Sequence, residues 1–414
     1  MPRFLITSNL TGFSNLSGLV LYLAEIMNIL FFGYWGANEG LSQSTINPHL
    51  EILANFDKVQ KIIYVSIERA QSSGFKIPQS PKIIHCPYYS IGKNRFLSKF
   101  GDFLGIPFFL KSLIKKENAD LLMSRSSLAG GIAYLTSYLI KIPYTVESFE
   151  PHADYMKELN IWPSNGISYK FQKWLEQKQK KRASHIMPVS VKYKYQLEKE
   201  GVPTSKVSVM PCAVDIDIFR FSELDRKMIR EKMKIEAEAI VGIYVGKFGG
   251  IYWDREAFKV FRSAFDYFDK FKLILLNNQD KLFISERFRE VSIPKNAVHH
   301  LSVEHHEVPK YLTAADLAFT FHKPIPSAIA FSPIKNGEYW ANGLPTISTS
   351  DIGDDSDLIK KHKIGLIAND DLSIKWSDLK LNSSDRNDST ETQVASEYRN
   401  FATTRSIYLR LLQA

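Results

Sequence analysis

The sequence predicts an α/β protein built from two doubly wound, Rossmann-like domains in tandem. Short apolar runs of strand length alternate with helical patterns from residue 28 onward, and this alternation is typical of parallel βαβ sheets. A chain of 414 residues is too long for one hydrophobic core. Residues 211–222, which have neither a helical nor a strand period, separate the two alternating halves.

In the first half, apolar runs bounded by polar or turn residues are predicted as strands: Asn28–Tyr34, Lys61–Ser66, Lys82–Cys86, Leu121–Ser124, Tyr144–Glu147 and His185–Val189. The intervening segments are predicted as helices: Ser44–Asn55, Phe96–Lys116, Ala129–Ile140 and Ile167–Arg182. After Ser190 we expect a helix to Glu200, ended by Gly201 and Pro203, and then a short strand Val207–Met210.

In the second half, the predicted strands are Ile240–Val245, Lys272–Asn277, Val298–Leu301, Leu317–Phe321 and Thr346–Thr349. The predicted helices are Arg255–Phe268, Val308–Ala314, one after Ser332, and a last one at Gln393–Leu412. Residues Ser377–Thr392 are mostly polar and are expected to form a loop.

These elements divide the chain into an N-terminal domain at 27–210, a linker at 211–222, a C-terminal domain at 223–392 and a final helix at 393–414. Residues 1–26 are expected to be an N-terminal extension, because the run that starts at Met27 looks like the natural opening strand of an α/β protein. The competing interpretation is a weak signal or anchor, although Arg3 is the single positive residue before the apolar stretch Leu19–Ala24.

The composition is that of an ordinary globular protein, with 44% hydrophobic and 23% charged residues. Two distant cysteines, Cys86 and Cys212, provide no disulfide framework. Residues 1–210 contain 25 Lys and Arg against 15 Asp and Glu, a net charge of +10 in a chain of +9. This excess suits an anionic membrane, an acidic acceptor or simply a solvated basic helix. No nucleic-acid module accompanies it, so nucleic-acid binding is not expected.

The segment from Ser332 to Pro345 reads as a helix with both ends specified. Ser332 is expected to cap the N-terminus before Pro333, and Gly343 to end the helix in a left-handed conformation. The amides of such an N-terminus attract anions, Lys335 adds a cation, and Glu338 lies one turn further along the same face. The segment therefore suits a nucleotide diphosphate, the alternative being a surface helix with a Lys–Glu pair.

This segment resembles the S-P-x-K-x-x-E-Y-x-A-x-G-x-P sequence of retaining GT-B glycosyltransferases of family four. Further stretches are similar to the same family: Ser190 to Phe219, Tyr244 to Phe248, Ala314-Ala315-Asp316 and Tyr398-Arg399. The resemblance covers roughly residues 28–414 and implies two Rossmann-like domains with an interdomain cleft. It also implies that the N-terminal domain binds the acceptor, that the C-terminal domain binds the nucleotide sugar, and that the last helix crosses back.

On the donor side, the resemblance implies that Glu338 binds the ribose and that Lys335 and the amides near Ile334 cradle the pyrophosphate. Lys247 stands where the family usually has an arginine, which keeps the charge but loses the bidentate fork. The expected donor-binding set is Gly246, Lys247, Ser332, Ile334, Lys335 and Glu338. Ala330 occupies the position of a second family glutamate, and either subfamily divergence or loss of activity would explain it.

On the acceptor side, the family usually places a histidine where His152 follows the strand Tyr144–Glu147. His152 and Glu150 are the expected catalytic residues, with Glu150 as an acceptor-side carboxylate; a histidine that only hydrogen-bonds within its loop is the alternative. Gly36 and Gly40 match the family's glycine-rich loop but form no G-x-G-x-x-G, so a dinucleotide site is not indicated. Arg125 is expected to face the cleft.

No cofactor is expected. The histidine pairs His299-His300 and His305-His306 have neither i,i+4 spacing nor cysteine partners, and GT-B enzymes are generally metal-independent. A surface loop is the favoured interpretation of these pairs.

The functional hypothesis is a retaining, hexosyltransferase-like enzyme that moves a sugar from a nucleotide diphosphate to a saccharide or lipid-linked acceptor. Because no nucleophile is evident, front-face displacement is expected. Surface polysaccharide biosynthesis in bacteria, in the cytoplasm or on the inner face of the membrane, would suit the basic first half. The alternatives are a catalytically weak nucleotide-sugar-binding partner subunit and a GT-B epimerase or phosphorylase.

Overall fold

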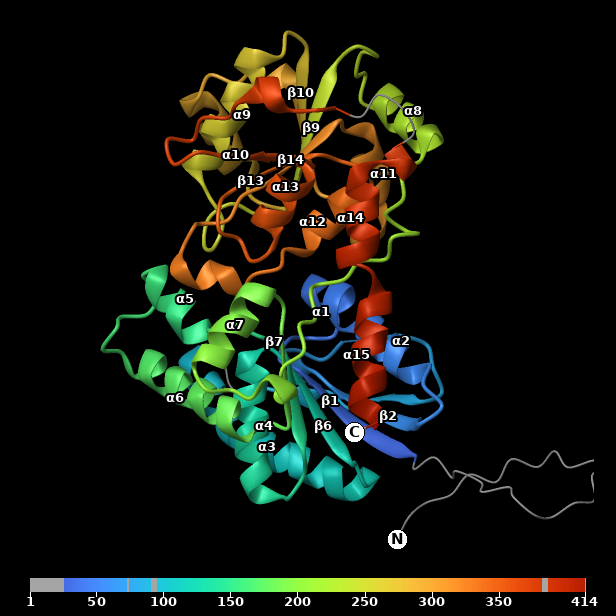
Figure 1. Ribbon diagram of the computed structural model, residues 1–414, viewed down its shortest axis with the longest axis vertical. Coiled ribbons are helices and arrows are strands. Elements are labelled where there is room, and N and C mark those ends of the chain that lie inside the picture. The colour runs from blue at the N-terminus through green and yellow to red at the C-terminus, as the bar shows by residue number, and fades with distance from the viewer. Residues whose placement is uncertain (1–25, 73, 91–94, 382–385, 414) are drawn as a thin grey trace, which may run out of the picture. The chain divides into compact units, whose positions relative to one another are not determined.

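The computed structural model of the protein (Figure 1) describes residues 26–413 except 73, 91–94 and 382–385. The predicted extension at 1–26 therefore lies, except for its last residue, outside the described residues. The chain divides into two compact units. Unit 1 contains the residues up to Phe149, then 174–187 and 405 onward, and unit 2 contains 150–173 and 188–404.

Unit 1 is built on a parallel sheet whose strand order is β4-β2-β1-β6-β7-β8. Its strands are β1 (Met27–Gly33), β2 (Val59–Val65), β4 (Ile83–His85), β6 (Leu121–Arg125), β7 (Tyr144–Phe149) and β8 (His185–Pro188). A small sheet pairs β3 (Ile67–Glu68) with β5 (Tyr88–Tyr89). The central strand β1 is fully buried from Ile29 to Phe32, as expected for a strand covered on both faces.

The helices of unit 1 cover both faces of this sheet (Figure 1). They are α1 (Gly40–Thr45), α2 (Asn47–Ala54), α3 (Arg95–Glu117), α4 (Ser127–Leu139), the second half of α6 (Ile167–Arg182), and α15 (Phe401–Gln413) from Arg405. The single helix predicted at Ser44–Asn55 is wrong, because a new helix starts at Asn47. Pro48 in its first turn lacks the N–H that would have continued the preceding helix.

Unit 2 repeats the architecture with a second parallel sheet of order β11-β10-β9-β12-β13-β14. Its strands are β9 (Ile240–Val245), β10 (Phe271–Leu276), β11 (Val298–Leu301), β12 (Leu317–Thr320), β13 (Thr346–Ser348) and β14 (Gly365–Ile367). Counted along each unit, both orders are 3-2-1-4-5-6, the doubly wound order of Rossmann folds. The predicted fold class is therefore confirmed.

The helices of unit 2 are α5 (His152–Glu158), α7 (Val191–Lys199), α8 (Glu223–Lys232), α9 (Arg255–Tyr267), α10 (Lys281–Glu290), α11 (Val308–Ala314), α12 (Ile334–Ala341), α13 (Asp355–His362) and α14 (Thr390–Tyr398). Short 3-10 turns accompany them: η1 (Thr204–Lys206), η2 (Lys295–Ala297), η3 (His305–Glu307), η4 (Pro326–Ala330), η5 (Trp376–Asp378) and η6 (Arg386–Asp388). The sequence analysis missed α5, α8, α10 and α13.

Two further predictions are wrong. The segment Val207–Met210 is not a strand, because Val207 forms only an isolated bridge, although the Met210 amide donates to the Pro188 carbonyl at 2.8 Å. The helix predicted at Gln393–Leu412 is two helices, α14 and α15, which are interrupted at Arg399 and Asn400. The carbonyl of Arg399 accepts a bond from the Val214 amide instead of continuing the helix.

Apolar side chains pack on both faces of the unit 2 sheet. One face contains mainly aliphatic residues together with Tyr339 and Trp340 of α12. The other is rich in aromatic rings, with Phe261 of α9 packed edge-on against Phe319 of β12 at 5.0 Å. Within the described ranges, no helix combines the length and hydrophobicity needed to cross a membrane.

Candidate functional site

Three of the predicted donor residues, Gly246, Lys335 and Glu338, lie near one another beside the carboxyl ends of β9 and β12, where the strand order of unit 2 reverses. Ligands of doubly wound sheets bind at this topological switch point. Gly246 follows β9 with a φ of +123°, a conformation that favours glycine. A Cβ at this position would lie 2.9 Å from the Nζ of Lys335. Gly246 therefore lets the backbone turn and brings the ammonium group close to it, while Lys247 is exposed on the same loop.

Helix α12 ends as predicted but begins differently. At its C-terminus Gly343 has a φ of +68°, and the Gly343 and Leu344 amides donate to the Trp340 and Tyr339 carbonyls. This pattern is a Schellman motif. At its N-terminus Pro333 occupies the capping position and no side chain caps the helix.

The predicted capping role of Ser332 is wrong, because its hydroxyl has other partners. The Ser332 hydroxyl accepts hydrogen bonds from the Cys212 amide, at 3.2 Å, and from the Arg399 guanidinium. Arg399 is itself fixed by a buried ion pair with Asp355, whose carboxylate also accepts from Asn336 at 2.6 Å. These contacts fix the first turn of α12, which contains Ile334, against the segments of Cys212, Asp355 and Arg399.

Lys335 is a buried cation without a hydrogen-bond or ion-pair partner among the described residues. Its Nζ lies 4.4 Å from the ring centroid of Tyr252 and 5.1 Å from that of Tyr244. Burial lowers its pKa to about 8, against the opposing effect of the Glu338 charge. An uncompensated buried ammonium is costly, so the arrangement is one that an anionic ligand would complete.

Glu338 lies one turn after Lys335 and is 4% exposed. Its Oε1 is 3.0 Å from Nε2 of His305, which belongs to η3. The hydrogen bond to Glu338 raises the pKa of His305. The sequence analysis assigned His305 to a surface loop and so missed this contact; its position directly after β11, at the carboxyl edge of the sheet, was the available signal.

His322 is a second buried group that the sequence analysis did not single out. It follows β12, its ring lies 4.7 Å from that of Tyr252, and its Nδ1 has no partner among the described residues. Burial, with the charge of Lys335 second, lowers its pKa well below the ordinary value. A neutral imidazole and a charged lysine therefore flank the same tyrosine ring at the switch point.

His152 begins α5, which belongs to unit 2 and packs on η4. Its Nδ1 is hydrogen-bonded to the Tyr155 hydroxyl and lies 3.4 Å from Oε1 of Glu150. The Tyr155 ring in turn meets Phe331 at 6.0 Å. The two predicted catalytic residues are thus neighbours, and an aromatic contact joins them to the segment that precedes α12.

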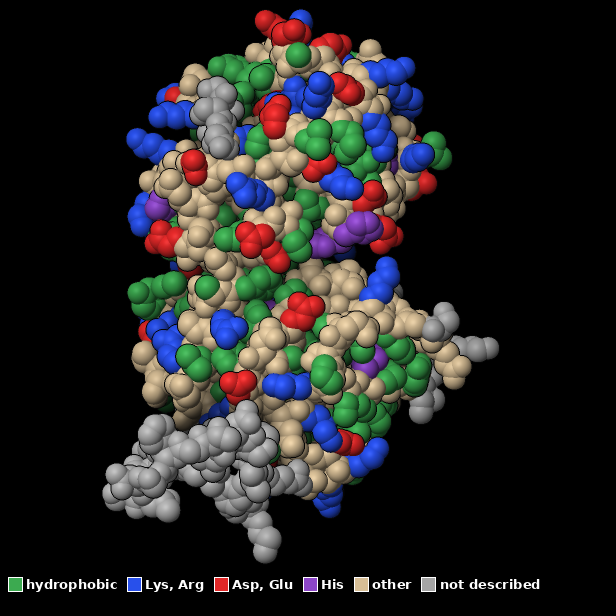
Figure 2. Space-filling view, turned by 90° about the vertical axis from the view of Figure 1, so that its right-hand side faces the viewer, with side chains coloured by type: hydrophobic (Ala, Val, Ile, Leu, Met, Phe, Trp, Pro, Cys, Tyr) green, Lys and Arg blue, Asp and Glu red, His purple; other side chains and the backbone are tan. Residues whose placement is uncertain are grey.

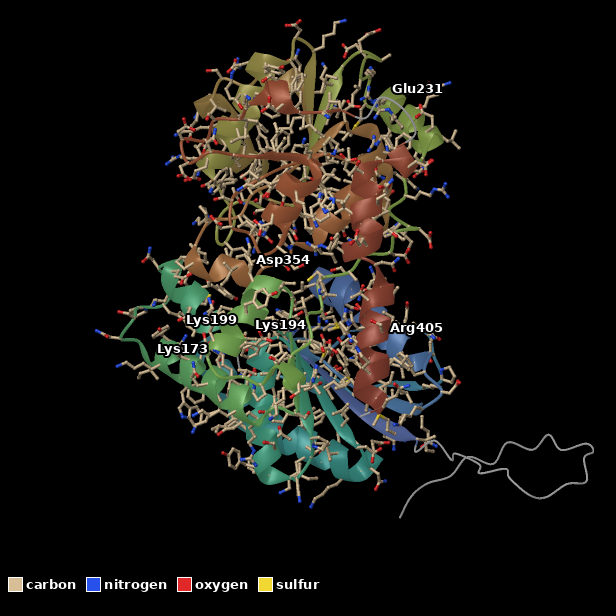
Figure 3. The ribbon with its side chains drawn as sticks, in the orientation of Figure 1. Lys173, Lys194, Lys199, Glu231, Asp354 and Arg405 are labelled. Carbon is tan, nitrogen blue, oxygen red and sulfur yellow. The ribbon has the colours of Figure 1, made fainter. Side chains whose placement is uncertain are left out.

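The segment around η4 is fixed by polar contacts. Glu158 of α5 accepts from the Ser327 amide at 2.9 Å. The carboxylate of Asp354, which is labelled in Figure 3, accepts hydrogen bonds from the Val191 and Lys192 amides at the start of α7. Ala330 is 1% exposed.

The predicted acceptor-side glycines lie in unit 1 after β1. Gly36 lines a cavity of about 510 Å³ together with polar residues of the two following segments: Asn38, Glu39, Glu68, Arg69, Gln71 and Ser72. Glu68 is 8% exposed and its Oε1 accepts from the Ala37 amide at 2.7 Å and from Ser66 at 2.6 Å. Gly40 begins α1 and does not line this cavity.

Arg125 is not open to a ligand in unit 1. It ends β6, is 4% exposed, and its Nη1 donates to Oε2 of Glu147 at 2.9 Å. Oε1 of Glu147 accepts from the hydroxyl of Tyr408 on α15, and that hydroxyl lies 2.6 Å from Nδ1 of His49. The predicted acceptor-side arginine is therefore part of a closed, buried network.

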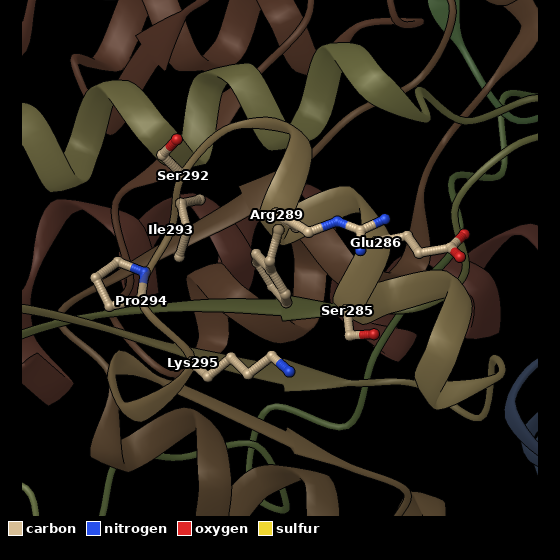
Figure 4. Close-up of a pocket in the computed structure, with 8 residues that line it drawn as sticks. Ser285, Glu286, Arg289, Ser292, Ile293, Pro294 and Lys295 are labelled. Carbon is tan, nitrogen blue, oxygen red and sulfur yellow. The ribbon is translucent and has the colours of Figure 1, made fainter.

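A further cavity of about 410 Å³ is lined by α10 and by the segment that follows it, up to Lys295 at the start of η2 (Figure 4). It is lined by residues including Arg289 and Lys295, and by none of the predicted site residues. Within the part of the chain that the structure describes, no cluster of three or more histidine, cysteine or acidic side chains could hold a metal ion.

Comparison with known proteins agrees with this fold. Residues 69–218 match the model of the family described as Glycosyltransferase Family 4. No curated protein matches the chain. Among solved structures, sucrose-phosphate synthase from Thermosynechococcus elongatus has a TM-score of 0.70 at 13% identity, covering 94% of this chain and 98% of that one.

Two other solved structures share the fold. HepE of Anabaena, solved in complex with UDP-glucose, has a TM-score of 0.67 at 14% identity and covers 94% of this chain and 99% of its own. A structure described as a UDP-N-acetylglucosamine 2-epimerase from Listeria monocytogenes has a TM-score of 0.58 at 12% identity. The match covers 92% of this chain and 95% of that one. At these identities the likeness concerns the fold alone.

The fold over nearly the whole chain is that of the GT-B proteins, which include enzymes other than transferases. The family match covers residues 69–218, and the solved structures show the GT-B fold that the sequence predicted.

Proposed function

We propose that this chain transfers a sugar from a nucleotide diphosphate sugar to a saccharide or lipid-linked acceptor, with retention at the anomeric carbon. The observation that carries the proposal is the buried ammonium group of Lys335, which has no hydrogen-bond or ion-pair partner among the described residues. It lies close to the backbone of Gly246, in the first turn of α12, whose N-terminus no side chain caps. A diphosphate supplies the missing negative charge, and helix N-termini bind phosphate through their amides.

The remaining residues fit the parts of a nucleotide sugar in order. Glu338, one helical turn after Lys335, accepts hydrogen bonds from the ribose hydroxyls. Lys247 contacts the diphosphate from the exposed side of the loop that follows β9. His152 presents Nε2 to the sugar, because its Nδ1 is held by Tyr155. The site would thus stabilise the charge that develops on the departing diphosphate.

In the proposed front-face displacement, the bond between the anomeric carbon and the diphosphate oxygen breaks as the acceptor oxygen attacks from the same side. The acceptor proton passes to a donor phosphate oxygen, so the enzyme need not provide a base. We propose that lysines and amides, rather than a metal ion, neutralise the leaving diphosphate. Glu150 would orient the His152 ring, because its Oε1 lies 3.4 Å from Nδ1 of His152.

The acceptor is proposed to bind in unit 1 at the cavity beside Gly36. Its lining combines two carboxylates, Glu39 and Glu68, with amide and hydroxyl groups, which suits a polyhydroxylated saccharide. Gly40, at the start of α1, would shape the same loop without lining the cavity.

We propose that helix α6 docks the protein reversibly on the inner face of an anionic membrane. One face of this helix exposes Ile167, Phe171 and Trp174, flanked by Lys170 and Lys181. Each basic residue near such a surface contributes about 1 kcal/mol. Lys180 of α6 does not take part, since it is buried against Phe149. On the face in Figure 2 acidic and basic side chains are interspersed, so attachment is not assigned to that face.

Membrane attachment would suit a lipid-linked saccharide acceptor, as in the synthesis of bacterial surface polysaccharide. Co-sedimentation with vesicles containing phosphatidylglycerol should show binding at low salt that high salt reverses and that Lys170→Gln with Lys181→Gln weakens. Binding that ignores salt would contradict the electrostatic part of this proposal.

A second function, a catalytically weak nucleotide-sugar-binding partner subunit, is favoured by one observation. Ala330 provides no carboxylate where the family places one toward the sugar. Release of nucleoside diphosphate from a panel of nucleotide sugars, with and without saccharide acceptors, separates the alternatives. Release that depends on acceptor and is lost in Lys335→Met supports the transferase, and binding without release supports the partner subunit.

The epimerase and phosphorylase alternatives give different products in the same assay. An epimerase converts the nucleotide sugar without acceptor, and a phosphorylase requires inorganic phosphate. Proton NMR of the glycosidic product tests retention, because the anomeric configuration of donor and product must then agree.

A further inference from the structure

The carboxylate of Glu338 is held by a histidine from a different segment of unit 2. His305, the first residue of η3, places Nε2 3.0 Å from Oε1 of Glu338. The His305 side chain is 49% exposed, whereas that of Glu338 is 5% exposed. The imidazole therefore reaches a buried carboxylate from the surface of the unit.

The ring of His305 is itself supported. It lies 5.8 Å from the ring of Phe219 at an interplanar angle of 56°. Phe219 is 5% exposed and belongs to the core cluster that also contains Tyr339 and Trp340 of α12. The histidine is thus fixed between a core aromatic ring and the carboxylate, and its contact with Glu338 does not depend on a freely rotating side chain.

The contact restricts how Glu338 can bind a ligand. Because Oε1 accepts from His305, Oε2 and the second lone pair of Oε1 remain for ligand hydroxyls. A carboxylate must keep one fixed plane to accept two hydroxyl groups of one ribose at once. Loss of the histidine would leave the carboxylate free to rotate at its outer end.

We propose that His305 is a positioning residue for nucleoside recognition: it orients the Glu338 carboxylate toward the ribose and does not itself contact the diphosphate. This inference rests on the proposed function, because it assumes that Glu338 binds the ribose. It predicts that losing His305 weakens ligands that contain a nucleoside and spares those that consist of phosphate alone.

The charges around His305 give the inference a pH signature. Glu338 faces the ring from α12, Lys335 lies one turn before Glu338, and Glu304, His306 and Glu307 accompany His305 on its own segment. The hydrogen bond to Glu338 raises the pKa of His305. As the pH rises through this pKa the imidazolium–carboxylate pair becomes a hydrogen bond from a neutral imidazole to the carboxylate, which is weaker. Nucleoside affinity should therefore fall relative to pyrophosphate affinity.

The test compares UDP, ADP or GDP, whichever binds most tightly, with inorganic pyrophosphate by calorimetry. His305→Ala should weaken the nucleoside diphosphate about tenfold, as expected for one lost charge-assisted hydrogen bond, and pyrophosphate less than twofold. His305→Gln keeps a donor at a similar reach and should recover most of the loss. His306→Ala, an exposed neighbour, is the matched control and should change neither affinity.

The pH dependence is read from the ratio of the two affinities, because titration of Lys335 affects both ligands and cancels. The ratio should fall with rising pH in the wild type and stay flat in His305→Ala and His305→Gln. Equal losses of both ligands in His305→Ala, or no loss, overturn the inference alone. A wild type that binds neither ligand overturns the proposed function as well.

Discussion

The two units have the same strand order but treat buried charge at the strand ends in opposite ways. In unit 1, Arg125, Glu147, His49 and Tyr408 form hydrogen bonds with one another at the ends of β6 and β7. In unit 2, Lys335 has no ion-pair or hydrogen-bond partner among the described residues, although it too is buried. A closed network stabilises a fold, whereas an open one is completed by a ligand.

Breaking the closed network should have the largest effect. Glu147→Ala leaves the Arg125 guanidinium buried without its carboxylate, and removal of one partner of a buried pair costs about 3–5 kcal/mol. Urea unfolding followed by intrinsic fluorescence measures the loss. The double variant Arg125→Met with Glu147→Leu should recover much of it. If Arg125→Met instead leaves the stability unchanged and abolishes use of the acceptor, Arg125 binds the acceptor as the sequence predicted.

Lys335→Met should behave in the opposite way. Removing an unpaired buried ammonium is expected to leave the free energy of unfolding unchanged or raised, while the affinity for nucleoside diphosphates falls by about tenfold to a hundredfold. Calorimetry and urea unfolding on the same samples separate the two effects. Lys310→Met on the exposed side of α11 is the matched control. Destabilisation with unchanged affinity would make Lys335 a structural residue.

The pH dependence of diphosphate binding sharpens the comparison. The pKa of Lys335 is lowered to about 8, chiefly by burial. Below this pH the lysine is charged before the ligand arrives, and above it binding must take up a proton. Affinity should therefore decrease by up to about tenfold per pH unit above pH 8. Lys335→Met should lose this slope, and a slope that persists in the variant would assign the titration to another group.

The smallest expected effects come from one glycine in each unit. Gly246→Ala places a Cβ 2.9 Å from Nζ of Lys335 and needs an unfavourable φ of +123°, so about 1–3 kcal/mol of strain and weaker donor binding are expected. Gly36→Ala meets Oε2 of Glu68 at 3.0 Å without a positive φ. It should change stability by less than about 1 kcal/mol and raise the KM for acceptor only. A donor KM that rises instead would remove Gly36 from the acceptor side.

Many regular elements of the fold could be predicted from the sequence because they depend on local pattern. Eleven of the twelve strands of the two six-stranded sheets, all except β14, and the Schellman end of α12 follow from apolar runs and from Gly343. The helix break at Arg399 could not be predicted, since it depends on the Val214 amide and on Asp355, both distant in the sequence. Ser332 was misread for the same reason, as its hydroxyl is taken by Arg399.

The site was predicted unevenly. Lys335, Glu338 and Gly246 could be named as candidates because a helix N-terminus and a strand end have recognisable sequences, and their role in donor binding stays a prediction. His305 was set aside because a histidine pair in a short segment contains no information on the helix it faces. The burial of Arg125 with Glu147 was missed since the two residues come from adjacent strands, and only the parallel register brings them together.

The uncapped start of α12 limits how this protein can be improved. Engineering for thermal stability commonly adds an acidic or hydroxyl side chain at a helix N-cap. Replacing Pro333 by aspartate would satisfy the amides of α12 from within the chain, and its carboxylate would occupy the position proposed for the phosphate. A higher melting temperature obtained by capping α12 would then lower the turnover. Selection for activity would therefore keep the N-terminus of α12 without a capping side chain.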